Sequence, residues 1–188
     1  MPLHVALIQI DIAFGDPDKN FAKVTTKIHE AMAGKPDIIV LPELWSTGYD
    51  LSRLDEIADD EGESTKTLIS SLAKQYNVNI ISGSVAKRSA SGITNTMYSF
   101  NRNGDVIGEY SKVHLFRLMD EEKYLQSAQQ EGMLEIEGTP CAGLICYDIR
   151  FPEWIRKHVI AGANILFVSA EWPKPRLSHW RTLLIARA

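Results

Sequence analysis

Residues 37–43 read Asp-Ile-Ile-Val-Leu-Pro-Glu, an apolar run that ends in a proline and a carboxylate. A nearly continuous apolar run is typical of a strand that is buried on both faces, as in the middle of an α/β sheet. Ligands of open α/β sheets usually bind beyond the carboxyl ends of the strands. The run therefore predicts an α/β protein in which Glu43 ends a central strand and lies beside a binding site.

The segments around this run alternate between strand and helix patterns. Residues 5–10 form another apolar run, which predicts a second strand buried on both faces. Residues 16–34 have an Asp-Pro start, an apolar stripe at helical spacing and a glycine at the end, as expected of a helix. Residues 65–76 carry a similar stripe, and residues 79–85 read as the next strand. This rhythm predicts one α/β layered domain over residues 1–188.

Further along the chain the pattern changes. Residues 97–100 and 106–110 are predicted to pair as a hairpin, because an Asn-Gly turn lies between them. Residues 140–146 read as a further strand, and residues 153–161 carry an apolar helical stripe. Cys146 therefore lies where a strand ends and a helix approaches.

Charge and hydropathy exclude two classes of partner. The 188-residue chain has 20 basic and 24 acidic residues, a formal net charge of −4 and no long block of one sign, which argues against nucleic-acid binding. No apolar run reaches the roughly 20 residues that a membrane-spanning helix needs. The N-terminus lacks the basic region and cleavage site of a secretion signal. We expect no nucleic-acid or membrane partner, and a cytoplasmic protein.

The two cysteines, Cys141 and Cys146, are expected to have different roles. They are five residues apart in one apolar stretch, where a strand would aim them at opposite faces, so a disulfide between them is geometrically poor. Cys141 lies inside the predicted strand and should pack in the core. Cys146 lies at the bend, where a nucleophile is exposed near backbone N–H groups that can stabilise an oxyanion.

A catalytic thiol needs a base or a positive charge nearby, because an unperturbed cysteine has a pKa of about 8.5. Of the five histidines, only His114 lies at an apparent strand end with site-like neighbours. Glu43 and Lys112 fit better, since both would meet Cys146 at one edge of the sheet. From spacing alone a plainer interpretation is favoured, in which the three residues are a strand-end carboxylate, a surface amine and a buried apolar thiol.

Three segments, in order, resemble the signature segments of the nitrilase superfamily of carbon-nitrogen hydrolases. They are LPELWSTGY at residues 41–49, YSKVHLF at residues 110–116 and CYDIRFPEW at residues 146–154. VALIQ near the start and EWPKPRLSHWRTLLIARA at the end are also similar to that family. Three ordered motifs are far more specific than one, and the resemblance spans essentially the whole chain.

The resemblance implies an α/β fold of the nitrilase type, a four-layer αββα sandwich. It implies that Glu43 is the general base, that Lys112 stabilises the oxyanion and that Cys146 is the nucleophile. The backbone N–H of Tyr147 would be the second oxyanion donor. No metal or organic cofactor would be required.

The family often has a second glutamate, beyond the lysine motif, that positions the other catalytic residues. Glu121 matches it best by spacing, with Glu122 as the alternative, although Ala128 stands where the family commonly has glycine. Asp148 is expected to make structural hydrogen bonds at the bend. His114 is expected to be structural, and its role stays open.

Five more residues are candidates for the wall of a substrate pocket. Core packing is an equal alternative for the aromatic ones, and structural hydrogen bonding is favoured for the arginine. The candidates are Trp45, Tyr49, Arg150, Glu171 and Trp172.

The amino-acid sequences of the motifs are most similar to those of the ω-amidase-like branch of the superfamily. This resemblance implies a hydrolase that releases ammonia from a small ω-amide of a carboxylic acid through a cysteine thioester. Alternatives within the superfamily are an N-carbamoyl amino acid hydrolase and a nitrilase. The alternative outside enzymes is a catalytically silent α/β binding module. The expected assembly is a homodimer or a higher homo-oligomer.

The end of the chain predicts a family domain that is incomplete at its C-terminus. Residues 183–188 continue a helical pattern without a glycine cap or a following breaker. The domain of the resembled family normally continues beyond this point, with strands of the second sheet and a tail at a dimer interface. A truncated domain over residues 1–188 is therefore the expectation.

Overall fold

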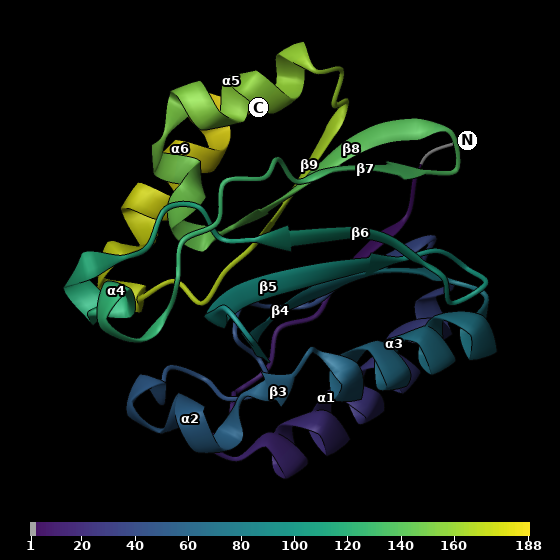
Figure 1. Ribbon diagram of the computed structural model, residues 1–188. Helices are drawn as coiled ribbons and strands as arrows, with labels where there is room; N and C mark the ends of the chain where they lie inside the picture. The colour runs from purple at the N-terminus through teal and green to yellow at the C-terminus, as the bar shows by residue number, and fades with distance from the viewer. Residues whose placement is uncertain (1–2) are drawn as a thin grey trace.

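Two β-sheets are stacked face to face, with helices on both outer sides, in the computed structural model, which describes residues 3–188 (Figure 1). The larger sheet has strand order β1-β2-β4-β5-β6, with β3 paired to β4. Its strands are β1 (Val5–Leu7), β2 (Ile38–Val40), β3 (Asp59–Asp60), β4 (Asn79–Ser89), β5 (Gly92–Phe100) and β6 (Val106–Ser111). Strands β1, β2 and β4 run parallel, whereas β4, β5 and β6 are antiparallel neighbours.

The smaller sheet and the helices complete the four layers. The smaller sheet has strand order β7-β8-β9 and consists of β7 (Met133–Ile136), β8 (Thr139–Ile145) and β9 (Ile165–Ser169). Helices α1 (Pro17–Ala31) and α3 (Glu63–Tyr76) cover the larger sheet, and α5 (Pro152–Ile160) and α6 (Leu177–Arg187) lie beyond the smaller one (Figure 1). Two short helices, α2 (Leu54–Ile57) and α4 (Glu121–Tyr124), lie at one end of the sheets. The predicted order of layers, α, β, β and α, is confirmed.

The position of β2 between two layers explains its continuous apolar sequence. Ile38 and Val40 pack in the core between the sheets, together with Leu144 of β8. Ile39 and Leu41 pack in a second core, between the larger sheet and α1 and α3. Because successive side chains of a strand point to opposite faces, a strand with both faces covered must be apolar at every position.

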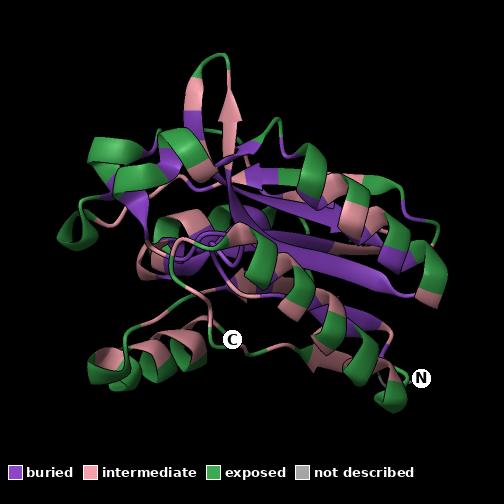
Figure 2. Cartoon of the chain, turned by 90° about the horizontal axis from the view of Figure 1, so that it is seen from below, coloured by how far each residue is buried: buried purple, intermediate pink, exposed green. Residues whose placement is uncertain are grey.

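Helix α1 begins where the sequence predicts it. The side chain of the N-cap residue Asp16 accepts the N–H of Lys19 at 3.1 Å, and Pro17 occupies the first turn. The helix buries Val24 and Ile28 against the sheet. Figure 2 shows the buried strands behind α1 and α3, whose outer faces are exposed.

The prediction that the first strand is buried on both faces is wrong, since Val5 and Ala6 are half-buried and Leu7 is exposed. The strand ends at Leu7 instead of residue 10, and among the described residues it pairs only with β2. Leu7 is 71% exposed and lines an apolar groove together with residues of β9 and α6. An edge strand has a neighbouring strand on one side only, so its side chains are covered less than those of β2.

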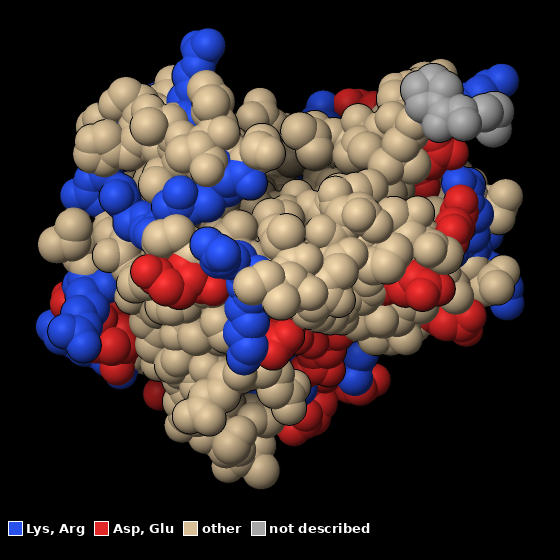
Figure 3. Space-filling view, turned by 90° about the horizontal axis from the view of Figure 1, so that it is seen from above, with Lys and Arg blue, Asp and Glu red and all other residues tan. Residues whose placement is uncertain are grey.

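The second half of the chain follows the predicted pattern with longer strands. The hairpin of β5 and β6 turns at Gly104, whose φ is 85°. Strands β7 and β9 have no counterpart among the predicted strands. No helix within residues 3–188 is long and apolar enough to span a membrane. The face that carries α5 and α6 has small groups of basic and acidic side chains, and large uncharged areas lie between these groups (Figure 3).

Candidate active site

The turn that carries Glu43 is fixed to strand β4. The strand has a bulge between Ile81 and Ser84, and the Ser84 N–H donates to the carbonyl oxygen of Pro42 at 3.0 Å. Gly83, inside the bulge, has a φ of 64°, and a Cβ atom there would collide with the same carbonyl oxygen. Glycine alone fits this close approach of two backbone segments. The bulge therefore determines where the Glu43 side chain begins.

Lys112 lies between two carboxylates in the interior. Its Nζ atom is 2.7 Å from Oε1 of Glu43 and 2.8 Å from Oε1 of Glu121, and all three side chains have 0% exposure. Oε2 of Glu121 also accepts the N–H of Phe116 at 2.8 Å. The structure thus brings Glu121 into the cluster, whereas the alternative residue, Glu122, is exposed.

Burial and charge act against each other in this cluster. Burial alone would lower the pKa of Lys112, but the negative charges around it, that of Glu43 first, raise it above its ordinary value. Burial raises the pKa of Glu121, and the charge of Lys112 opposes this shift. An ammonium between two carboxylates therefore stays protonated, and it compensates charges that would otherwise be costly to bury.

Glu43 accepts hydrogen bonds on both carboxylate oxygens. Asn95, in β5, donates its Nδ2 to Oε1 at 3.0 Å, in addition to Lys112. The backbone N–H of Glu171 donates to Oε2 at 3.0 Å. Asn95 was not among the predicted site residues, and its only sequence signal is a polar residue inside a strand pattern. These donors hold the carboxylate in one orientation.

Cys146 lies at a strained bend directly after β8. It is the first residue of the 3-10 helix η4 (Cys146–Arg150), and its φ is 44°, a left-handed conformation that non-glycine residues rarely adopt. The side chain lines a cavity, and the residue is 6% exposed. Burial, followed by the charge of Glu43, raises the pKa of the thiol well above its ordinary value, while Lys112 acts in the opposite direction. A base is therefore needed to activate this thiol.

Asp148 fixes the bend, as expected of a structural residue. Its Oδ2 accepts the N–H of Ile145 at 3.1 Å and the hydroxyl of Tyr110 at 2.7 Å. Its Oδ1 accepts the backbone N–H of His114 at 3.0 Å and lies 2.7 Å from His114 Nδ1. The His114 ring stacks on Phe151 with 3.7 Å between centroids. His114 is therefore a structural histidine of the bend.

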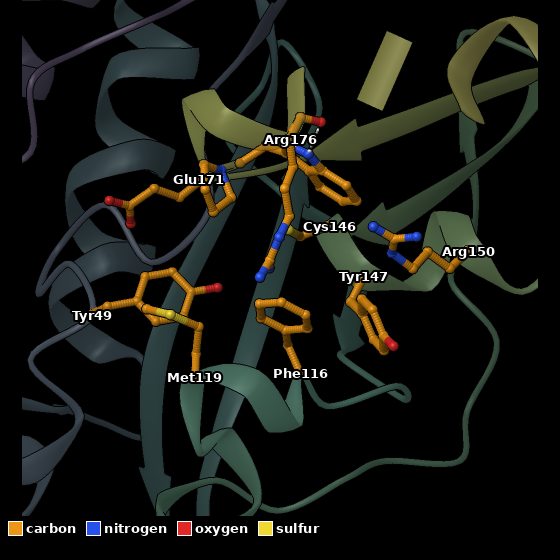
Figure 4. Close-up of a pocket in the computed structure, with 10 residues that line it drawn as sticks. Tyr49, Phe116, Met119, Cys146, Tyr147, Arg150, Glu171 and Arg176 are labelled. Carbon is orange, nitrogen blue, oxygen red and sulfur yellow. Dashed lines mark hydrogen bonds between the residues drawn. The ribbon is translucent and has the colours of Figure 1, made fainter. Parts of the chain in front are cut away.

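The cavity at Cys146 has a volume of about 220 Å³ (Figure 4). Four of the five predicted wall residues line it, namely Tyr49, Arg150, Glu171 and Trp172, and so does Tyr147. The hydroxyl of Tyr49 also donates to Oε1 of Glu121 at 3.0 Å. Burial, followed by the charge of Glu43, raises the pKa of Glu171 to about 7.

Four wall residues were not predicted. Met119 ends the 3-10 helix η3 (Arg117–Met119), and Phe116 directly precedes that helix. Arg176 ends the 3-10 helix η5 (Lys174–Arg176), and Pro173 directly precedes it. A 3-10 helix of three residues is too short for a sequence periodicity to indicate which side chains face the cavity.

The prediction that Trp45 lines the pocket is wrong. Trp45 is fully buried in the core between the larger sheet and the helices, where its ring lies 4.9 Å from that of Phe21. Its Nε1 donates to the carbonyl oxygen of Ser82 at 2.7 Å. The preceding residue, Leu44, has a φ of 44°. This left-handed residue reverses the chain after Glu43, so that Trp45 points toward the helices.

Both cysteines are free thiols, as the predicted geometry requires. Cys141 has 0% exposure inside β8, and its Sγ lies 3.3 Å from the carbonyl oxygen of Thr139. Within residues 3–188, no group of three or more His, Cys, Asp or Glu side chains is arranged to hold a metal ion.

Known proteins are similar to this chain in sequence and in fold over almost its whole length. The chain is 52% identical over 188 residues to a 2-oxoglutaramate amidase of Bacillus subtilis strain 168, a match that covers 100% of this chain and 72% of that protein. It is 32% identical over 187 residues to an ω-amidase of Escherichia coli K12, covering 99% of this chain and 70% of that protein.

A solved structure gives the same result. A CN-hydrolase superfamily protein from Xanthomonas campestris, with an arsenic adduct in its active site, superposes with a TM-score of 0.90 at 28% identity, covering 98% of this chain and 71% of that one. The sequence model of the carbon-nitrogen hydrolase family matches residues 4–188. The resemblance of the three motifs is thereby confirmed, and the chain belongs to the carbon-nitrogen hydrolase family.

Proposed function

We propose that the protein is an amidase that hydrolyses the terminal amide of a small carboxylic acid, an ω-amide, and releases ammonia. The observation that carries this proposal is the buried contact of Lys112 with both Glu43 and Glu121, beside a cysteine that lines a cavity. A base and a cation beside a nucleophile that lines a cavity are the groups that acyl transfer requires. The names of the relatives, 2-oxoglutaramate amidase and ω-amidase, support an amide as the substrate.

In the first half-reaction, Glu43 accepts the proton of the Cys146 thiol while the sulfur attacks the amide carbon. The raised pKa of Cys146 requires this coupling, because the thiol is protonated at neutral pH. The carbonyl oxygen becomes an oxyanion, which Lys112 and the backbone N–H of Tyr147 stabilise. Glu43 then gives the proton to the amide nitrogen, the C–N bond breaks, and ammonia leaves a thioester on Cys146.

In the second half-reaction, Glu43 removes a proton from a water molecule whose oxygen attacks the thioester carbon. The same donors stabilise the second oxyanion. The C–S bond then breaks, the proton held by Glu43 passes to the sulfur, and the carboxylic acid leaves. Glu121 acts as a positioning residue, because its contact with Lys112 fixes the ammonium beside the reacting atoms.

The remaining cavity wall is proposed to contact the part of the substrate beyond the amide. Tyr49, Arg150, Glu171 and Trp172 form this part of the wall. A volume of about 220 Å³ favours a substrate of a few carbon atoms over a polypeptide.

Ammonia release from an amide, a carbamoyl compound and a nitrile of the same carbon chain tests the proposal. We expect the amide to be hydrolysed fastest and Cys146→Ala to release no ammonia. Faster hydrolysis of the nitrile or of the carbamoyl compound would show that the protein is a nitrilase or an N-carbamoyl hydrolase instead of an amidase. No release from any substrate, with Cys146 alkylated no faster than Cys141 at neutral pH, would favour a silent binding module.

We also propose that residues 1–188 belong to a single carbon-nitrogen hydrolase domain, that the protein acts in the cytoplasm, and that it assembles as a homodimer or a higher homo-oligomer. A reducing compartment suits a mechanism that depends on a free thiol. Assembly is supported by large exposed apolar side chains, among them Leu7, Leu177 and Ile185. Sedimentation of the purified protein tests the assembly, and a monomer at micromolar concentration would contradict it.

A further inference from the structure

Two guanidinium groups enter the cavity from different elements. Figure 4 shows Arg150 reaching it from η4 and Arg176 reaching it from η5, on another side of the cavity. The Arg176 guanidinium lies 5.4 Å from the centroid of the Phe116 ring. The Arg150 guanidinium lies 5.2 Å from the centroid of Trp172. An aromatic ring beside a guanidinium supports the cation without using its N–H donors. One nitrogen of Arg150, Nη2, also lies 3.4 Å from Nδ1 of His179.

Neither arginine has an acidic partner in the described part of the chain. Within residues 3–188, neither forms an ion pair with an Asp or Glu side chain, whereas Arg53, Arg88 and Arg102 each form at least one. Nε of Arg150 is buried and has no hydrogen-bond partner among these residues. Two partly buried guanidinium groups without an ion-pair partner at one cavity favour the binding of an anion there.

The turn that carries Arg176 is held in place. The Nε1 of Trp172 donates to the carbonyl oxygen of Arg176 at 2.8 Å, which closes the segment into a turn. Pro173 and Pro175 restrict the backbone inside it. The Arg176 side chain therefore starts from a fixed position at the rim of the cavity.

We propose that Arg176 is a specificity-determining residue, which together with Arg150 binds the carboxylate at the end of the substrate remote from the amide. This inference rests on the proposed amidase function and deepens it. A guanidinium presents a planar fork of N–H donors that matches a carboxylate, and a lysine would not reproduce that fork. Two such groups fix the remote end of the substrate while Cys146 attacks the amide at the other end.

The same pair of cations disfavours a substrate that carries an ammonium next to its carboxylate. In Figure 4 the Glu171 side chain extends beside Tyr49, on the opposite side of the cavity from Arg150. Its carboxylate does not come within 4 Å of either guanidinium to form an ion pair. An α-ammonium placed between the two arginines would meet like charge. The site therefore selects acids without an α-amino group over amino acids.

Three four-carbon amides that differ in the charged groups they carry provide the test. Succinamate carries the remote carboxylate, butyramide lacks it, and asparagine adds an α-ammonium. We expect the wild-type protein to prefer succinamate over both. In Arg176→Met, which keeps an unbranched chain against Phe116, kcat/KM for succinamate should fall about tenfold or more relative to butyramide, mainly through KM. Arg176→Lys should restore part of this loss, since it keeps the charge.

Lys174→Met is the matched control, because it removes a positive charge from an exposed residue of the same turn that does not line the cavity. It should leave the succinamate-to-butyramide ratio unchanged. An unchanged ratio in Arg176→Met with a normal unfolding midpoint would overturn the proposal, as would equal losses on both substrates. Succinate binding to Cys146→Ala, with and without Arg176→Met, tests the carboxylate site without turnover. Weaker succinate binding without Arg176 supports the site even if the amidase function fails, and unchanged binding overturns it.

Discussion

The ammonium nitrogen of Lys112 lies 2.7 Å from a carboxylate oxygen of Glu43, and neither side chain has any exposed surface. Glu121 contacts the same nitrogen at 2.8 Å, so one cation compensates two buried carboxylates. Removing one member of such a group leaves an uncompensated charge in the interior. Breaking up the proposed catalytic cluster should therefore also destabilise the fold. Substitutions that leave a buried charge unpaired should reduce both stability and turnover, whereas those that keep the hydrogen bonds should mainly reduce turnover.

Lys112→Ala should reduce both stability and turnover. It leaves Glu43 and Glu121 buried together without a cation, which should cost about 3–5 kcal/mol of the free energy of unfolding. Urea unfolding and ammonia release measure the two effects. Lys123→Ala is the control, because Lys123 is a surface lysine of α4, and it should change neither quantity appreciably. A Lys112→Ala protein of normal stability would show that the cluster does not depend on the cation.

Glu43→Gln should mainly reduce turnover. The amide still accepts hydrogen bonds from Lys112 and Asn95 on one oxygen, so the fold should persist. It cannot carry the proton between sulfur, nitrogen and water, and a positioned acid–base group contributes about 10²–10⁴-fold. Rapid-quench and steady-state kinetics should find both acylation and deacylation slowed. Near-normal turnover would remove Glu43 from the role of base.

Comparison of Cys146→Gly with Cys146→Ala should reveal the strain at the nucleophile. Both proteins should be inactive, because neither has a thiol. The φ of 44° costs an alanine energy that a glycine does not incur. Cys146→Gly should therefore be more stable than Cys146→Ala, by about 1 kcal/mol in urea unfolding. The opposite order would mean that the backbone relaxes once the sulfur is removed.

Cys141→Ala should lower stability slightly and leave turnover intact, unlike the substitutions at Cys146. Cys141 is fully buried in β8 and does not line the cavity. Loss of one buried heavy atom should cost about 0.5–1.5 kcal/mol, as for one methylene group. Turnover per folded molecule should remain close to that of the wild type. A protein that is stable but inactive would assign Cys141 a part in the chemistry.

The residues that the sequence could predict share one physical origin. Glu43, Lys112 and Cys146 each follow a strand-like segment, and strands of stacked sheets bring their ends to one side of the molecule. The order of the layers follows in the same way from the apolar runs and helical stripes. Glu121 could be predicted only from its spacing beyond the lysine motif of the resembled family, because a helix of four residues is too short to show a periodicity.

The residues that the sequence could not predict depend on irregular backbone. Trp45 points to the helices because Leu44 adopts a left-handed conformation, which an apolar pattern does not indicate. Arg176 reaches the cavity because Trp172 closes a turn through a backbone carbonyl. Asn95 lies inside a strand, where a polar residue is normally assigned to an exposed face. The contact of Asn95 with Glu43 joins positions 52 residues apart, so local propensity does not encode it. The other two cases depend on local backbone conformations that strand and helix patterns do not specify.

Asn95→Ala should weaken catalysis through Glu43 without direct contact with substrate. It removes the Nδ2 donor that lies 3.0 Å from Oε1 of Glu43. A hydrogen bond to a charged group contributes about 1.5–3 kcal/mol, so kcat/KM should fall roughly tenfold or more. The same donor fixes the orientation of the Glu43 carboxylate, so the loss should appear in kcat while KM stays nearly constant. Thr94→Ala, at the neighbouring position of β5, is the control. An unchanged kcat with a lowered unfolding midpoint would limit Asn95 to packing.

Glu171 should make the affinity for an anionic substrate depend on pH. Burial, followed by the charge of Glu43, raises its pKa to about 7, so its carboxyl group is neutral below that pH and negatively charged above it. Glu171 is part of the wall of the cavity that is proposed to hold a substrate carboxylate, and like charges repel. KM for succinamate should therefore rise severalfold between pH 6 and pH 8, while KM for the neutral butyramide should stay nearly constant. Glu171→Gln keeps the backbone N–H that donates to Glu43 and removes the titrating group, so it should abolish this difference between the two substrates. If KM for succinamate remains flat across this pH range in the wild-type protein, the carboxyl group of Glu171 does not act on the bound anion.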